Sequence, residues 1–127
     1  MKVEALYTPH VRTVDPGEDL AVAASRMQFH EIGALAVFDR SRFVGIITER
    51  DVLRAVGDGR DPERTAVATY MVEEPVTVSL DTEAAVAAET MVQLGVRHLP
   101  VVDRGELVGM LSARDLLEDE ASAAMVE

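Results

Sequence analysis

Two seven-residue segments, residues 45–51 and 109–115, place a hydroxyl and a carboxylate at the same spacing. In the first segment Thr48 precedes Asp51 by three residues, and in the second Ser112 precedes Asp115 by three. A hydroxyl and a carboxylate at this spacing are typical of a helix start, in which the hydroxyl residue is the N-cap. The same groups can also bind a nucleotide. A helix N-terminus attracts phosphate, and a carboxylate accepts hydrogen bonds from both hydroxyls of a ribose diol. A glycine opens each segment, which permits close approach of a ligand to the backbone.

The two segments belong to an internal repeat. Shifting the sequence against itself by about 64 residues aligns residues 13–53 with residues 77–117 without a gap. Roughly 16 of about 41 aligned positions are identical, which is more than shared composition explains. The chain therefore contains two copies of one unit, and each copy carries one hydroxyl–carboxylate pair.

Each copy predicts the element order β-α-β-β-α. The expected first strands are residues 11–14 and 76–78, the helices 20–30 and 84–94, and the paired strands 35–38 with 43–47 and 99–102 with 107–111, each followed by a second helix. This order gives an α+β (α/β) fold in which a small sheet buries one face under two helices. Because about 60 residues make a marginally stable unit, we expect the two copies to pack sheet on sheet in pseudo-two-fold symmetry.

A connector separates the two copies. Residues 57–65 read Gly-Asp-Gly-Arg-Asp-Pro-Glu-Arg-Thr, a composition typical of turns. We therefore predict a first repeat with the start of the linker over residues 1–60. The second repeat, with a C-terminal tail, then covers residues 61–127 within one compact module.

Charge and composition restrict the partners. The 127 residues contain 12 Lys and Arg against 23 Asp and Glu, a net charge of −11, which disfavours DNA and anionic membranes. No apolar run is long enough for a signal peptide or a membrane span, so we expect a cytoplasmic protein. The absence of cysteine excludes disulfides, thiolate zinc sites and a cysteine nucleophile.

The sequence offers no arrangement typical of catalysis. His10, His30 and His98 lack the spacing of metal ligands, and neither a nucleophile elbow nor a P-loop is present. We therefore predict that the chain is not an enzyme, has no catalytic or metal-binding residues and requires no cofactor.

The repeated segments, together with His-Leu-Pro-Val-Val-Asp at residues 98–103, resemble the tandem cystathionine-β-synthase (CBS) domain pair, also called a Bateman module. The resemblance covers about residues 3–118. Members of that family bind the ribose of an adenosine ligand with the aspartate, and ribose or phosphate with the hydroxyl residue. The resemblance thus implies these roles for Thr48, Asp51, Ser112 and Asp115.

The resemblance also implies that each cleft is built across the two copies. Thr48 and Asp51 would face Val96, Arg97 and His98, whereas Ser112 and Asp115 would face Ile32, Gly33 and Ala34. Since Arg97 and His98 can pair with a phosphate and glycine and alanine offer only backbone groups, the first of these clefts is the favoured phosphate site. Arg97 and His98 are equally compatible with ordinary solvated positions.

A loop position near the ligand in some relatives corresponds to Ser79 in the second copy and to Asp15 in the first. Asp15 would repel a phosphate there, which further disfavours the second cleft.

The predicted function is regulatory: a stand-alone module that senses AMP, ADP or ATP and signals through its conformation or its dimer arrangement. S-adenosylmethionine and NADH present the same ribose diol and remain alternatives. The family implies a homodimer of two pairs and an unknown protein effector. The other interpretation is a ligand-free scaffold that dimerises and acts through a protein partner.

Overall fold

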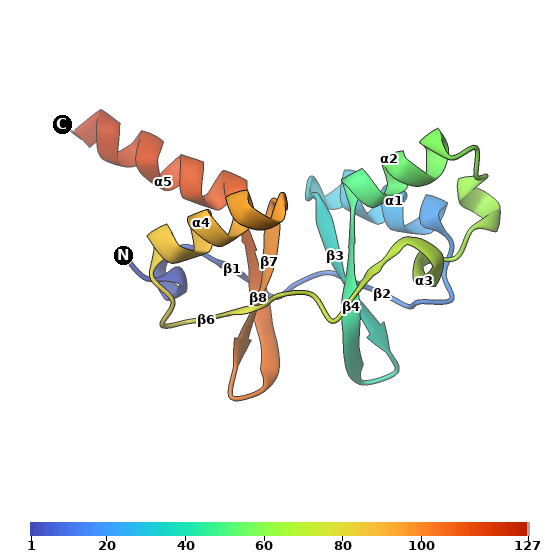
Figure 1. The fold of residues 1–127 in the computed structure, drawn as a ribbon, viewed down its shortest axis with the longest axis horizontal. Coiled ribbons are helices and arrows are strands. Elements are labelled where there is room, and N and C mark those ends of the chain that lie inside the picture. Colours follow the sequence, from blue (N-terminus) through green and yellow to red (C-terminus); the bar gives the residue numbers. More distant parts are fainter. Residues whose placement is uncertain (127) are drawn as a thin grey trace. The chain divides into compact units, whose positions relative to one another are not determined.

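The computed structural model describes the backbone of residues 1–126 and the side chains of residues 1–119. The chain divides into two compact units, one formed by residues 12–75 and the other by residues 1–11 together with the chain from residue 76 onward. Each unit contains the predicted β-α-β-β-α order (Figure 1). The predicted α+β class and the internal repeat are therefore confirmed.

The unit of residues 12–75 has one mixed sheet. Its elements are β2 (Thr13–Val14), α1 (Leu20–His30), β3 (Ala34–Asp39), β4 (Arg42–Thr48), α2 (Glu49–Gly57), a 3-10 turn (Pro62–Arg64), α3 (Val67–Tyr70) and β5 (Val72–Glu73). The strand order is β2-β3-β4-β5, with β2 parallel to β3 and the other pairs antiparallel. The predicted first helix agrees with α1 at both ends, and the connector contains the 3-10 turn.

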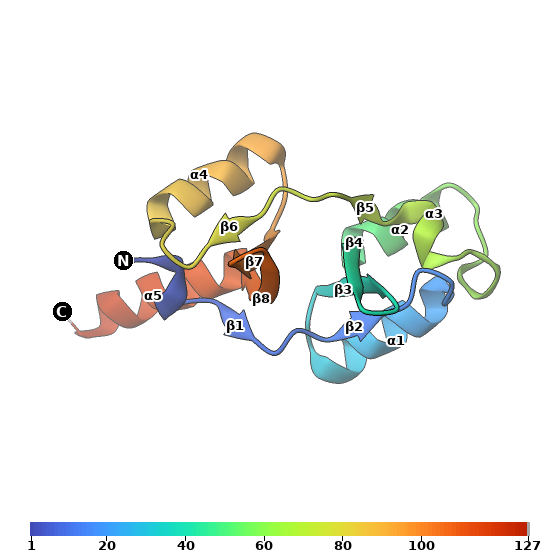
Figure 2. The same cartoon turned by 90° about the horizontal axis from the view of Figure 1, so that it is seen from below.

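The other unit repeats this plan. Its elements are a 3-10 turn (Val3–Ala5), β1 (Thr8–Pro9), β6 (Val78–Ser79), α4 (Ala84–Leu94), β7 (His98–Asp103), β8 (Glu106–Ser112) and α5 (Ala113–Val126). The strand order is β1-β8-β7-β6, and Figure 2 shows β1 beside β8. The predicted second-repeat helix again agrees with α4 at both ends.

The N-terminal residues join the second repeat, which differs from the division predicted at residue 60. Val3 is fully buried in the second repeat's core, and its N–H donates to the Thr82 carbonyl at 2.8 Å. β1 then pairs antiparallel with β8. β1 and β5 lie 64 residues apart and are therefore equivalent positions of the repeat. β1, which precedes the first repeat's strands, joins the sheet of β6, β7 and β8, and β5 joins the sheet of β2, β3 and β4. A two-residue strand carries too little periodicity to reveal this exchange.

Two apolar clusters hold the helices against the sheets. The cluster of residues 12–75 contains Leu20 and Met27 from α1 and Leu35 and Ile47 from β3 and β4. The equivalent cluster is formed by Val3, Val78, Ala87, Met91, Leu99, Val101 and Leu111. Alternate residues of each central strand face these helices, as the period of a strand requires. In each unit, the helix α1 or α4 thereby packs against the strand pair that ends at the repeated segment.

The glycine that opens each repeated segment is explained by strand packing. A Cβ atom on Gly45 would collide with the Val72 carbonyl oxygen of β5, and one on Gly109 would collide with the Tyr7 ring and the Thr8 carbonyl oxygen. The glycines thus admit the fourth strand of each sheet. The segments that approach these two glycines closely are therefore neighbouring parts of the chain itself, whereas the sequence suggested a ligand.

Glu31 is strained at the end of α1, and its replacement by glycine should stabilise the fold. Glu31 caps the helix in the left-handed conformation (φ 54°), and its repeat equivalent on α4 is Gly95 (φ 68°). Because a side chain costs about 1 kcal/mol in this conformation, Glu31→Gly should raise the free energy of unfolding by about that amount. Urea unfolding measures the change. The reverse substitution, Gly95→Glu, should lower stability. Equal stabilities for the native protein and both variants would contradict the left-handed strain assigned to Glu31.

Candidate functional site

The two hydroxyl–carboxylate pairs lie where the last strand of each repeat ends and the next helix begins. We call Thr48 and Asp51 the first polar pair. The Asp51 N–H donates to Thr48 Oγ1 at 3.3 Å, while Asp51 Oδ2 accepts from the Thr48 N–H at 2.8 Å and from Thr48 Oγ1 at 3.0 Å. This reciprocal arrangement is the predicted capping box. The Asp51 side chain is only 7% exposed, so its carboxylate is fixed in position.

Ser112 and Asp115 form the second polar pair at the start of α5. Asp115 Oδ2 accepts from the Ser112 N–H at 2.9 Å, and the Asp115 N–H donates to Ser112 Oγ at 3.1 Å. Both residues are half-buried. The predicted capping role is thus found in both repeats.

Within each unit, the loop before the central strand lies against the polar pair of the same repeat. The Gly33 carbonyl accepts from the N–H of Glu49 at 3.0 Å, and Ala34 is the β-ladder partner of Thr48. Ile32, the third predicted residue of this loop, packs against the unit's core. The first polar pair is thereby joined to a loop that offers backbone groups.

The corresponding loop of the other unit carries the side chains of Arg97 and His98. The Arg97 carbonyl accepts from the Ala113 N–H at 2.8 Å, and His98 is the β-ladder partner of Ser112. Val96 and Arg97 are exposed, and among the described residues no carboxylate pairs with the Arg97 guanidinium. The pairing of each polar pair with the loop of the other copy stays a prediction.

Ser79 lies away from the second polar pair along the sheet. Its ladder partner is Val102, four residues along β7 from His98. The Ser79 N–H donates to Thr82 Oγ1 at 3.1 Å, which closes a turn before α4. The predicted part of Ser79 in ligand binding also stays a prediction.

An arginine that the sequence analysis did not single out contacts the first polar pair. Arg54 Nη2 lies 3.5 Å from Asp51 Oδ1 and 3.3 Å from the Tyr70 carbonyl oxygen, to which it donates. The guanidinium carbon is 5.3 Å from the centre of the Tyr70 ring. The Tyr70 hydroxyl donates to Asp58 Oδ2 at 2.7 Å, and this bond raises the pKa of Tyr70 above its usual value. The three-residue spacing of Arg54 from Asp51 was the available sequence signal.

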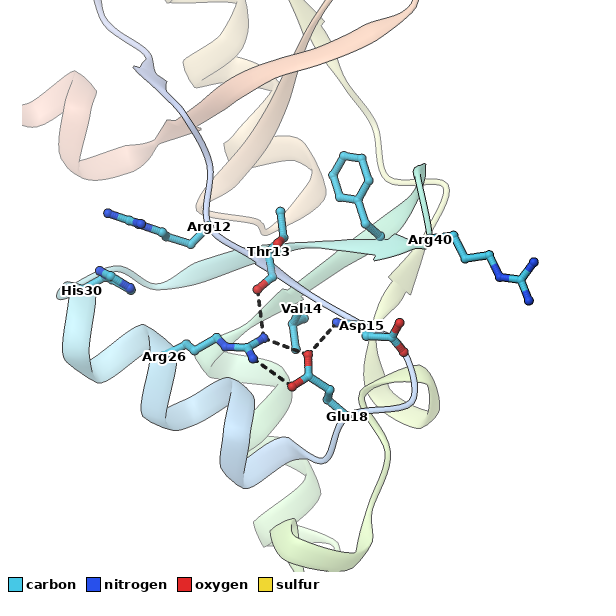
Figure 3. A pocket seen from close by; sticks show the side chains of 9 residues that line it. Arg12, Thr13, Val14, Asp15, Glu18, Arg26, His30 and Arg40 are labelled. Atoms are coloured by element: carbon cyan, nitrogen blue, oxygen red, sulfur yellow. Dashed lines mark hydrogen bonds and ion pairs between the residues drawn. The ribbon is translucent and has the colours of Figure 1, made fainter.

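A separate open cavity of about 510 Å³ lies beside β2 and α1 (Figure 3). Arg26 pairs with both carboxylate oxygens of Glu18 at 2.8 Å, and this bond lowers the pKa of Glu18. Figure 3 shows the Arg12 and Arg40 guanidinium groups pointing away from each other. The cavity therefore lacks convergent cations. Of the positions considered from the sequence, Asp15 and His30 line it.

No helix among the described residues is long and apolar enough to cross a membrane. No three of their His, Asp or Glu side chains gather in a way that could hold a metal ion.

Comparisons with known proteins agree with the duplicated architecture. A family model for the CBS domain matches residues 3–58 and again residues 67–121. The CBS domain-containing protein YhcV of Bacillus subtilis is 35% identical over 121 residues, which cover 94% of this chain and 86% of YhcV. A solved protein with CBS domains from Burkholderia ambifaria has a TM-score of 0.91 and 29% identity, covering 96% of this chain and 95% of its own.

One solved relative contains a nucleotide. A CBS domain protein from Pyrobaculum aerophilum, complexed with AMP, is 29% identical with a TM-score of 0.83. The alignment covers 96% of this chain and 99% of that protein.

Proposed function

Because the chain belongs to the CBS-domain family, with one CBS domain in each repeat, we propose that it senses an adenosine-containing ligand and has no catalytic activity of its own. Membership of this family, with two CBS domains, makes the chain a CBS-pair regulatory module. The observation that carries the proposal is the duplicated polar pair at a helix N-terminus. In both repeats a carboxylate is held in place by the backbone N–H of the hydroxyl residue.

The chemistry of each polar pair suits a ribose with an attached phosphate. A carboxylate accepts hydrogen bonds from both hydroxyls of a ribose diol, and such charge-assisted bonds are about twice as strong as neutral ones. The helix start next to it stabilises negative charge. The AMP-bound relative supports AMP as the first ligand to test. ADP, ATP, S-adenosylmethionine and NADH share the diol.

A ligand can act as a signal only if it binds two arrangements of the protein with different affinity. We propose that the affected arrangement is that of the module or of a homodimer, which an effector protein then reads. No cofactor is needed for this role, because the chemistry consists of binding alone.

Thermal unfolding with each of the five compounds tests the proposal. A ligand at about 100 times its dissociation constant should add roughly 2.7 kcal/mol of stability, which is readily measured. AMP should raise the unfolding temperature, and 2′-deoxy-AMP, which lacks one hydroxyl of the diol, should raise it much less. Equal shifts with both compounds would contradict ribose recognition by the polar pairs.

A scaffold that acts without ligand is the second candidate, and exposed apolar side chains favour it. Phe29 of α1 is 80% exposed, Leu53 of α2 is 70% exposed and Val92 of α4 is 81% exposed. Burial of these side chains between two copies of the chain would give a homodimer an apolar interface. Analytical ultracentrifugation at micromolar concentration should show a dimer. A dimer without any ligand-induced thermal shift would favour the scaffold, and a monomer would count against it.

A further inference from the structure

The residue three positions after the aspartate differs between the two polar pairs. Arg54 follows Asp51 on α2, whereas Glu118 follows Asp115 on α5. Arg54 places a guanidinium nitrogen 3.5 Å from Asp51 Oδ1. Glu118 carries the same charge as Asp115 and therefore cannot form an equivalent ion pair. The repeat thus supplies an internal cation to one carboxylate and none to the other.

Arg54 is held in place by the short helix α3. Its Nη2 donates to the Tyr70 carbonyl at 3.3 Å, and the guanidinium lies over the Tyr70 ring. Tyr70 is only 9% exposed and is itself anchored by its hydroxyl bond to Asp58. The equivalent turn of the other unit, Val3–Ala5, is followed by Leu6 at the position of Tyr70, so it offers no aromatic ring or hydroxyl there. The ion pair between Arg54 and Asp51 is therefore supported by a fixed neighbour.

The hydrogen bonds already made by Asp51 leave little capacity for a ribose. A carboxylate has about four lone-pair positions, two on each oxygen. Asp51 Oδ2 uses both of its positions for the N–H and the hydroxyl of Thr48, and Oδ1 faces Arg54. The Thr48 hydroxyl proton is also committed to Asp51. A diol that binds both oxygens must first displace a partner.

Asp115 Oδ2 is less engaged by its cap residue. It accepts one hydrogen bond from Ser112, through the N–H, whereas Asp51 Oδ2 accepts two from Thr48. Ser112 Oγ accepts from the Asp115 N–H, which leaves its own proton available to a ligand oxygen. The second polar pair therefore needs less rearrangement than the first to accept a ribose diol.

We propose that Arg54 is a specificity-determining residue that keeps the first polar pair closed to ribose, so that AMP binds first at Ser112 and Asp115. This inference rests on the proposed function and adds an order of occupancy to it. The order is the reverse of the one that Arg97 and His98 favour from the sequence, which places the stronger phosphate site at Thr48 and Asp51.

Titration of the ¹⁵N-labelled chain with AMP, followed by NMR, tests the order directly. The amide signals of Ser112 and Asp115 should shift at lower AMP concentration than those of Thr48 and Asp51. Arg54→Gln keeps a donor for the Tyr70 carbonyl but removes the charge. It should raise the affinity of the first polar pair roughly fivefold, the upper range of an exposed ion pair. Arg64→Met, which removes a charge from an exposed side chain elsewhere in the same unit, is the matched control.

Three outcomes are distinguishable. If AMP shifts the amides of Thr48 and Asp51 first, the proposed function stands and the order is wrong. If Arg54→Gln weakens AMP binding at the first pair, the guanidinium contacts the ligand and does not exclude it, which overturns the role given to Arg54. If AMP shifts neither set of amides, nucleotide sensing fails, and the order of occupancy fails with it.

Discussion

Replacing Asp51 and Asp115 together by asparagine should reduce the thermal stabilisation by AMP to about a third, from roughly 2.7 to roughly 0.9 kcal/mol at about 100 times the native dissociation constant. Asp115 can accept two charge-assisted hydrogen bonds from a ribose diol, and Asp51 can do so once a partner is displaced; neutral acceptors lose about 1 kcal/mol per bond. The loss at either pair is therefore about 2 kcal/mol, or roughly 30-fold in affinity. Isothermal titration calorimetry with AMP measures this loss.

The fold should survive this double substitution. An asparagine oxygen can still accept from the Thr48 or Ser112 N–H, so each helix keeps a cap. The matched control is Asp39→Asn with Asp103→Asn, which removes the same two charges from exposed, repeat-equivalent hairpin positions. Unchanged AMP affinity in the Asp51 and Asp115 variant would contradict the binding site. An equal loss in the control would attribute the effect to net charge.

Gly109→Ala should destabilise the protein by about 3 kcal/mol, the upper part of the range for overpacking. The added methyl group would meet the Tyr7 ring and the Thr8 carbonyl oxygen, and backbone cannot move aside as a flexible side chain can. β1 would be pushed away from β8, and the bonds between the strands would weaken. The midpoint of urea unfolding reports the change.

Gly57→Ala is the control for this substitution. Gly57 ends α2, and a Cβ atom there meets nothing within 4 Å. Alanine should be neutral or stabilising at that position, because it forms helix more readily than glycine. If Gly109→Ala is as stable as Gly57→Ala, the segment before β1 does not pack against β8 as described.

The sequence predicted the elements whose signal is local. The repeat alignment and the helical spacing located α1 and α4 at both ends, and the hydroxyl–carboxylate spacing identified both capping pairs. Met27 and Met91 occupy equivalent positions on α1 and α4, and both are buried in the cores. These features depend on residues a few positions apart, which a single sequence displays directly.

Features that depend on distant contacts were not predictable in the same way. The assignment of β1 to the second repeat rests on pairing across about 100 residues, and a two-residue strand has no periodicity of its own. The contact between Arg54 and Asp51 is local, but its support by Tyr70 depends on how α3 packs after an irregular connector. The two polar pairs share one hydroxyl–carboxylate spacing, and these neighbours make their surroundings unequal.

The exchange of edge strands also bears on how the chain folds during synthesis. The unit of residues 12–75 obtains all four strands from one continuous stretch, so it can close before the second half leaves the ribosome. The other sheet must wait until β8 emerges to pair with β1, and such non-local pairing slows folding. Until then the N-terminal eleven residues have no sheet to join. The first unit is therefore the expected early folding nucleus, and the N-terminus is a late-docking segment.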